Sequence, residues 1–223
     1  MNFTQLTDNE IMSRLIADVV HKIKNGLGGI GGYATLLEKE FTCNDPKIRF
    51  VKKINDGVVS VNEISVKLMS LVRIRELQKE KIRIEYLFRE ILKNISRNNY
   101  ELIDKLYFDN TFHEKYIEII SDQDVLGELF KNSIQFLQEI TEEIYKIQIT
   151  SSKDKNLLIH IHFKKKFENQ KNFSDYIKHL MQDSRHLYER LCFAIIQKMI
   201  VLLSGTYSTE SKNNEINILK LEI

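Results

Sequence analysis

The chain has 223 residues, of which 43% are hydrophobic, so it is long enough for two small domains or one large one with a buried core. Its 33 basic and 31 acidic residues give a net charge of +2 and are mixed along the chain, which excludes a global positive field that would recruit nucleic acid. Two cysteines, Cys43 and Cys192, lack metal-like spacing and predict a reducing compartment without disulfides.

The sequence does not predict a membrane segment or a leader. Its first ten residues lack the pattern of a signal peptide, and its most apolar stretch, residues 191–203, is short and includes Gln197 and Lys198. We therefore expect a cytoplasmic protein that does not enter a membrane. The remaining length leaves no room for a sensor or receiver module.

A long amphipathic helix is predicted from a capping box at residues 7–10 to about Glu40. Five of the chain's eight glycines fall within residues 26–32, in the middle of this helix. Each costs about 1 kcal/mol relative to alanine in a helix interior. The run therefore predicts a surface that another molecule approaches, or a close contact with a neighbouring helix. The apolar residues form one stripe at helical spacing: Ile16, Val19, Val20, Ile23, Leu27, Ile30, Ala34 and Leu37.

One histidine of this helix lies away from the apolar stripe. His21 is about 200° around the helix from Val19, so it points into solvent. Asn25, Gly28 and Gly32 follow on its face, one, two and three turns on. An exposed imidazole beside a glycine track predicts a docking surface on which chemistry is carried out on the histidine. The alternative is an ordinary surface histidine.

A break at residues 43–46 separates the first helix from a second. Asp45 suits a cap, and Pro46, the chain's single proline, suits the first helical position. Two long helices joined by a short loop predict an antiparallel hairpin, and pairing two hairpins buries both apolar stripes in a four-helix bundle. We therefore expect a homodimer; the alternative is that a second domain covers the stripes in a monomer. The second helix has near-heptad apolar residues: Ile48, Val51, Ile54, Val58, Val61, Ile64 or Ser65, Leu68 and Val72.

A second domain is predicted after a charged connection at residues 77–84. The pattern predicts helices at 84–94 and from a Ser121 cap to about Tyr145, and strands at 106–108, 116–120, 147–150 and 157–163. His160 and His162 share a strand face without further ligands nearby, which favours ordinary surface residues. Residues 164–183 are irregular in pattern. A helix at 184–203 ends at Ser204-Gly205, and a hairpin at 206–209 and 216–223 closes the chain.

Residues 21–33 resemble the phosphoacceptor box of the two-component sensor histidine kinases. In that box a histidine is followed by an acid, two further residues, Asn or Thr, and often proline. His21 matches the phosphorylated histidine and Asn25 the Asn/Thr position, whereas Lys22 replaces the acid and Gly26 the proline. The second domain is also similar: residues 121–136 resemble the family's asparagine box, and residues 191–211 its last helix and following hairpin. The resemblance implies that His21 and Asn25 are catalytic.

The ATP-binding residues of that family are largely absent. Asn132 matches the magnesium asparagine as a vestigial position, but Glu128 and Gln135 replace the first asparagine and the lysine. No glycine lies between Gly127 and Gly205, although phosphate-cradling backbone needs glycine's permissive dihedrals. We therefore expect neither ATP binding nor an intrinsic cofactor or metal. Lys22 agrees with this, because a cationic lysine cannot take the imidazole proton as a carboxylate does.

The predicted fold is α+β. A helical hairpin at residues 1–78, which forms a four-helix bundle as a dimer, precedes a degenerate ATPase-like α/β sandwich at residues 79–223. The resemblance implies a histidine phosphotransferase that passes a phosphoryl group between receiver aspartates through His21, with magnesium supplied by the response-regulator receiver. Gly28 and Gly32 would admit the receiver. Lys24 would reach the phosphoryl oxygens, and Lys22 would contact the receiver's acidic rim. The alternative for both lysines is that they are simply solvated. The alternative functions are an atypical histidine kinase that uses ATP and a non-catalytic adaptor that binds receivers or kinases.

Overall fold

The computed structural model describes residues 8–42, 45–73, 76–95, 100–109, 116–152, 156–165, 173–211 and 216–223. The chain divides into two compact units, Met1–Arg75 and Glu76–Ile223. Thr7 of the expected capping box and Cys43 lie outside the described residues.

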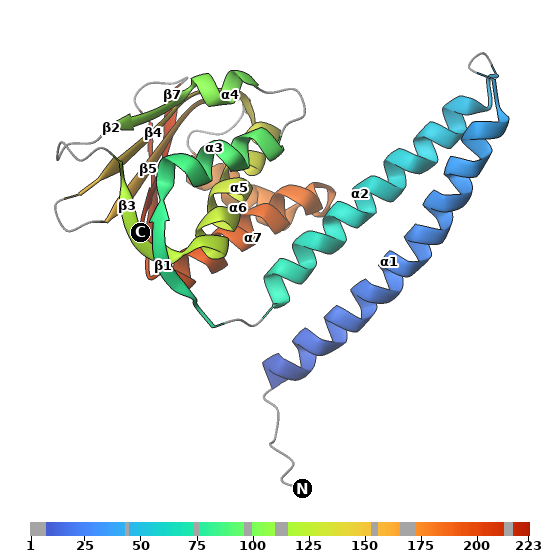
Figure 1. Ribbon diagram of the computed structural model, residues 1–223, viewed down its shortest axis with the longest axis horizontal. Helices are drawn as coiled ribbons and strands as arrows, with labels where there is room; N and C mark the ends of the chain where they lie inside the picture. The colour runs from blue at the N-terminus through green and yellow to red at the C-terminus, as the bar shows by residue number, and fades with distance from the viewer. Residues whose placement is uncertain are drawn as a thin grey trace, which may run out of the picture. The chain divides into compact units, whose positions relative to one another are not determined.

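The first unit is the predicted antiparallel helical hairpin (Figure 1). Helix α1 spans Asp8–Glu40 and helix α2 spans Ile48–Val72. The Asp45 carboxylate accepts a hydrogen bond from the Lys47 N–H at 2.8 Å, and the Asp45 carbonyl accepts one from Ile48 at 3.0 Å. Helix α2 nevertheless begins at Ile48, so the expectation that Pro46 takes the first helical position is wrong: Pro46 and Lys47 form a turn, which the Asp45 carboxylate holds.

The two helices pack through one part of each predicted apolar stripe. Val20 and Ala34 of α1 are buried, as is Val51 of α2. A Cβ built on Gly31 would lie 3.4 Å from Val58 Cγ1, so these two positions face each other. Other stripe positions of α1 stay exposed: Val19, Ile23, Ile30 and Leu37. The single predicted stripe is therefore two adjacent faces, of which one contacts α2 and the other is uncovered.

The second unit contains two sheets. A two-stranded antiparallel sheet pairs β1 with β3, and a five-stranded sheet has the order β2-β4-β5-β7-β6, in which only β2 and β4 are parallel. The strands span Lys79–Arg83 (β1), Leu106–Asp109 (β2), Glu118–Asp122 (β3), Thr141–Ser151 (β4), Leu157–Lys165 (β5), Thr206–Ser211 (β6) and Ile216–Glu222 (β7).

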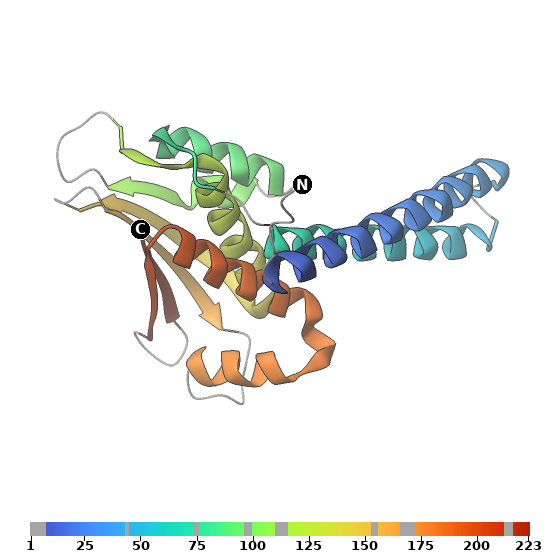
Figure 2. The same cartoon turned by 90° about the horizontal axis from the view of Figure 1, so that it is seen from below.

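Helices cover one face of the larger sheet (Figure 2). Helices α5 and α7 pack against each other, and Phe130 of α5 stacks on Phe88 of α3 with ring centroids 3.9 Å apart. The core lies between these helices and the inward residues of the sheet, such as Ile149 and Ile161. The helices span Ile84–Ile95 (α3), Tyr100–Asp104 (α4), Gln123–Ile140 (α5), Phe173–Gln182 (α6) and Leu187–Leu202 (α7), the last preceded by a 3-10 turn at Ser184–His186.

The predicted fold class is confirmed, but three element assignments are wrong. The segment expected to be a charged connection forms strand β1, in which Ile82 alone is buried, so the pairing with β3 rests on backbone hydrogen bonds that composition does not reveal. Helix α5 ends at Ile140 rather than near Tyr145, and residues 141–145 begin β4. Its cap is Asp122, whose carboxylate accepts from the Val125 N–H at 2.9 Å, rather than Ser121.

Two further expectations for the second unit are also wrong. The segment expected to be irregular contains helix α6, whose Phe173 and Leu180 are buried. His162, expected at the surface, is only 9% exposed, and its ring lies 5.8 Å from that of Tyr145 on the neighbouring strand. This outer face of the sheet is therefore covered locally by an aromatic neighbour.

The predicted end of the last helix is confirmed at Ser204-Gly205. Ser204 adopts a positive φ of 57°, and the Gly205 N–H donates to the Ile200 carbonyl at 2.9 Å. A Cβ built on Gly205 would lie 2.4 Å from the Glu222 carbonyl oxygen. Glycine is required here by the close approach of β7.

We predict that Gly205→Ala lowers the free energy of unfolding by about 1–3 kcal/mol, because strand or helix must shift to admit the methyl group. Ser204→Gly, one residue earlier, is the matched control and is expected to be neutral or stabilising by up to about 1 kcal/mol, since it relieves a left-handed non-glycine residue. Guanidinium unfolding of the full chain followed by circular dichroism measures both. Equal stability of Gly205→Ala and the wild type would contradict the close approach.

Candidate functional site

His21 lies on an unbroken stretch of α1 and is exposed. Asn25, one turn later, is exposed on the same face, followed by Gly28 and Gly32. Helix α1 continues through the whole glycine run, so the helical spacing that relates these four residues is the one the sequence predicts.

Four of the five glycines in this run face open space. A Cβ built on Gly26, Gly28, Gly29 or Gly32 meets nothing within 4 Å, apart from the helix's own neighbouring backbone. Each glycine costs the helix about 1 kcal/mol relative to alanine. Close packing within the hairpin therefore accounts for Gly31 alone, and the surface beside His21 is free of side chains over two turns.

The two lysines that flank His21 differ in environment. Lys22 is exposed and lies about 100° around the helix from His21. Lys24 is half-buried, on the side of α1 that turns toward α2. Lys24 is therefore held closer to the hairpin surface than Lys22.

The opposite side of the hairpin is apolar and exposed. On α1 it consists of Met12, Val19, Ile23, Ile30 and Leu37, and on α2 of Phe50, Ile54 and Val61. We call these eight residues the apolar face. Val19 lies about 160–200° from His21 around α1, so the apolar face and the histidine are on opposite sides of the helix.

In the second unit, the asparagine that matches the family's magnesium position is turned into its own helix. Asn132 of α5 is 5% exposed, and its Nδ2 donates to the Glu128 carbonyl at 2.8 Å. This hydrogen bond ties the Asn132 side chain to the backbone one turn earlier in α5.

An aromatic cluster fills the space between α5, α7 and the sheet next to Asn132. Phe173 of α6 is 3% exposed, and its ring centroid lies 6.3 Å from that of Phe136 on α5 and 5.8 Å from that of Phe163 on β5. Phe193 of α7 lies 5.5 Å from Phe136. Helix α6 thus contributes its first residue to a closed hydrophobic core.

Carboxylates of the chain itself lie at the N-terminal end of α7. Asp183 accepts from the Arg185 N–H at 2.9 Å and pairs with the Arg185 guanidinium at 2.7 Å. These bonds to Arg185 hold the pKa of Asp183 well below its usual range. Glu189 Oε1 lies 3.0 Å from His186 Nδ1, and burial together with Glu189 raises the pKa of Tyr176 to about 12. The partial positive charge of this helix end is thus met by protein carboxylates.

The described residues contain neither a metal-binding cluster nor a membrane-spanning helix. No group of three or more His, Cys, Asp or Glu side chains among them is arranged to hold a metal ion. No helix among them is long and apolar enough to cross a bilayer.

No family model matches the chain, and no curated protein matches its sequence. Solved structures do resemble it. The histidine kinase AdeS of Acinetobacter baumannii is 14% identical, with a TM-score of 0.51 over 94% of this chain and 95% of its own. The histidine kinase ThkA, solved with the response regulator protein TrrA, is 19% identical, with a TM-score of 0.55 over 96% of this chain and 61% of its own.

The chain has the histidine kinase fold. A further structure with this fold, full-length ShkA in complex with AMPPNP, is 15% identical and has a TM-score of 0.69 over 94% of this chain. The chain spans 45% of the ShkA chain and 61% of the ThkA chain. The histidine kinase fold therefore covers both the hairpin and the second unit.

The sequence predicts the exposed face of α1 that carries His21, Asn25 and the glycine track. It does not predict helix α6 or the carboxylates at the N-terminal end of α7. Phe173, Tyr176, Ile177 and Leu180 recur at helical spacing, and this signal predicts α6 once the segment is not assumed to be a polar loop. The Asp183 and Glu189 carboxylates at α7 had no comparable signal, because their role depends on where the helix begins.

Proposed function

We propose that the chain is a histidine phosphotransferase of a two-component phosphorelay, in which His21 accepts a phosphoryl group from one receiver aspartate and returns it to another. The observation that carries the proposal is the bare surface beside His21, where a Cβ built on Gly28 or Gly32 would meet no atom within 4 Å in the described part of the hairpin. A receiver of the kind that ThkA was solved with is the partner this surface would admit.

The reaction needs little beyond position and charge. A neutral His21 ring nitrogen attacks the phosphorus of an aspartyl phosphate in line; the N–P bond forms as the P–O bond to the aspartate breaks, and the carboxylate leaves with the electron pair. The other ring nitrogen then releases its proton to water. Magnesium would come with the receiver, and α1 would supply the orientation of His21 and the positive charge of Lys24.

The polar residues around His21 have separate roles in this proposal. Asn25, one turn away, orients the water that hydrolyses the phosphohistidine. Lys24 neutralises charge on the phosphoryl oxygens, and Lys22, which lies off this face, contacts the acidic rim of the receiver. Such an exchange with receivers puts the protein in the cytoplasm.

The second unit favours phosphotransfer over autophosphorylation. Phe173 fills the space beside Phe136, the Asn132 amide is bonded to its own helix, and protein carboxylates lie at the N-terminal end of α7. In this proposal these features leave the region between α5 and α7 to the chain's own side chains rather than to a nucleotide. The second candidate, a histidine kinase that uses ATP, is favoured by the fold itself and by the AMPPNP complex of ShkA.

We predict that the protein does not bind ATP at physiological concentration. The reason is the absence of glycine between Gly127 and Gly205, together with Glu128 and Gln135 at the positions of the family's asparagine and lysine. Titration calorimetry of the full chain with magnesium-ATP checks this. A dissociation constant below about 1 mM, equivalent to about −4 kcal/mol, would favour the kinase over the phosphotransferase.

We predict that His21→Ala abolishes phosphoryl uptake from a labelled receiver while leaving thermal stability unchanged, because the side chain is exposed. Gly28→Leu and Gly32→Leu should keep His21 and the helix but slow uptake by at least about tenfold, since the new side chains fill the docking surface. Asn25→Ala should change the rate of phosphate loss more than the rate of uptake. Rapid mixing with phosphorylated receivers of the same cell measures all four.

Gly28→Ala is the graded control for this experiment. Its single methyl group enters open space, so uptake should slow less than in Gly28→Leu while the helix gains up to about 1 kcal/mol. If the wild type takes up no label from any receiver but binds one of them, the protein is an adaptor and His21 is vestigial.

We further propose that the hairpin forms a homodimer through the apolar face. Eight exposed apolar side chains on one side of two helices form a continuous surface, and pairing two hairpins buries them in a four-helix bundle. Because this face is opposite His21, the dimer leaves both histidines accessible.

We predict that Val61→Glu raises the dimer dissociation constant by at least about tenfold, because it buries an unpaired carboxylate in the bundle. Val59→Glu is the matched control: Val59 is also exposed, but it lies about 160–200° from Val61 around α2, outside the apolar face. Light scattering across a concentration series measures the mass of each variant. A monomeric wild type, or equal dissociation of both variants, would exclude this interface.

A further inference from the structure

A groove of about 650 Å³ lies between helix α6 and strand β6 of the second unit. Ile177 and Met181 of α6 line it with apolar side chains, and residues 207–209 line it from β6. Phe193 and Gln197 of α7 line it as well. Its volume is within the range of binding cavities in proteins, and all of its lining residues belong to the second unit.

Strand β6 borders the groove with its backbone edge. It is the last strand of the five-stranded sheet, so one edge pairs with β7 and the other pairs with no strand in the described part of the chain. Three consecutive β6 residues line the groove, although consecutive side chains of a strand point to opposite faces. The edge rather than one face therefore meets the groove. Every second residue of an antiparallel strand directs its N–H and C=O away from its partner, and such groups can pair with another chain.

The β6 side of the groove is held in place by the core. The Tyr207 ring lies edge-on to that of Phe193, with centroids 5.9 Å apart, and its hydroxyl accepts a hydrogen bond from Gln197 Nε2 at 3.4 Å. Phe193 is 3% exposed and belongs to the aromatic cluster around Phe136. The edge of β6 is thus ordered before any partner binds, which lowers the entropic cost of binding.

The groove is close to electrically neutral. Lys178 is the one charged residue among the described residues that line it, and the Asp175 carboxylate lies 3.9 Å from its Nζ. Both side chains are at least half exposed, so this pair contributes little and draws no further charge into the groove. The groove therefore complements a segment without charged side chains.

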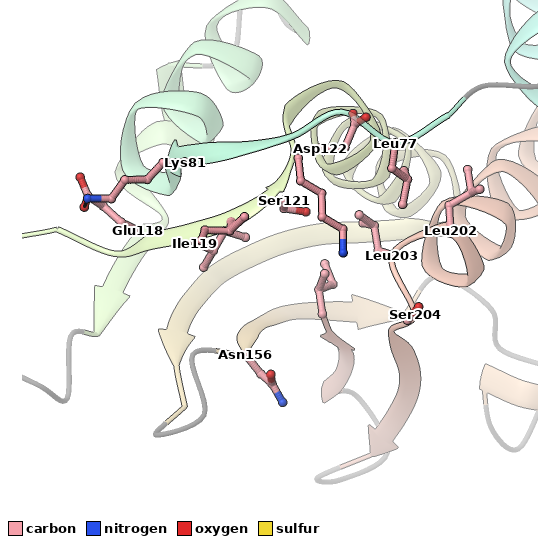
Figure 3. A pocket seen from close by; sticks show the side chains of 13 residues that line it. Leu77, Lys81, Glu118, Ile119, Ser121, Asp122, Asn156, Leu202, Leu203 and Ser204 are labelled. Carbon is pink, nitrogen blue, oxygen red and sulfur yellow. Dashed lines mark ion pairs between the residues drawn. The ribbon is translucent and has the colours of Figure 1, made fainter.

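A second cavity of this unit lacks such a preference. It lies between the small sheet and the end of α7 (Figure 3). Its two lysines, Lys79 and Lys81, are matched by two carboxylates, Glu118 and Asp122. The charges of this cavity therefore favour neither an anion nor a cation.

We propose that the groove between α6 and β6 binds an extended, uncharged segment of another protein as an additional strand on β6. The backbone of the segment would hydrogen-bond to the free edge, and a large apolar side chain at every second position would lie against Ile177 and Met181. A small apolar molecule would fill the groove but leave the edge groups to water. The proposal does not depend on phosphotransfer through His21.

The test is an NMR titration of the full chain with a capped hexapeptide of alternating threonine and leucine. Its binding is expected to shift the amides of residues 207–209 saturably and to slow hydrogen exchange at least about tenfold at every second amide of Thr206–Ser211. The same peptide with alanine in place of leucine should bind at least about fivefold more weakly, because it loses apolar contact. The peptide N-methylated at every residue should weaken similarly, because it has no N–H to donate.

Two variants of α6 separate the groove from the rest of the helix. Met181 and His179 are both exposed, but they lie about 160–200° apart around α6, and of the two Met181 alone lines the groove. Met181→Glu should weaken binding of the leucine peptide by at least about fivefold, because a charge enters the apolar side. His179→Glu is the matched control and should change binding by less than about twofold. Thermal unfolding checks that both variants keep their fold.

Four results would overturn the proposal. The first is the absence of saturable shifts at residues 207–209 up to about 5 mM peptide. The second is shifts without slower exchange at alternate amides, which would indicate an apolar ligand site instead of an added strand. The third is equal weakening by Met181→Glu and His179→Glu. The fourth is slow exchange of the same amides in the free protein that increases with protein concentration, which would assign the edge to a second copy of this chain.

Discussion

Helix α1 has to remain helical through five glycines in residues 26–32, at a cost of about 1 kcal/mol each relative to alanine. An isolated helix of this sequence would be weakest at its centre. The contacts with α2 offset that cost, because Val20 and Ala34 are buried on either side of the run and Gly31 meets Val58 within it. The geometry around His21 thus depends on packing that takes place on another face of the same helix.

The second unit has the fold of its structural relatives, and its own side chains fill its interior. Asn132 is bonded to its own helix and Phe173 completes an aromatic core, so the region between α5 and α7 is closed by the chain's own side chains. Asp183 and Glu189 likewise supply, at the N-terminal end of α7, the negative charge that a helix end attracts.

The sequence predicts much of the hairpin, because long helices repeat their apolar residues at a regular spacing. Helical periodicity over 25 or more residues fixes α1, α2 and the side on which His21 lies. Strand β1 was missed because Ile82 is its single buried side chain and its pairing with β3 is a backbone interaction. The boundary between α5 and β4 was misplaced because Thr141 and Ile144 fit either pattern. The sequence could not predict which glycine packs against α2 and which faces open space. Periodicity places Gly28 and Gly31 on different faces of α1, but it does not show which face has a neighbouring helix.

The separation of the two sides of the hairpin has a consequence for how such a protein can diversify. Val61 and Val59 are two residues apart in the chain, yet they lie on nearly opposite sides of α2. A side chain changed at one of these positions therefore projects from a different side of the hairpin than a side chain changed at the other. If the hairpin pairs through the apolar face as proposed, a single substitution such as Val61→Glu changes self-association while the surface beside His21 keeps its side chains.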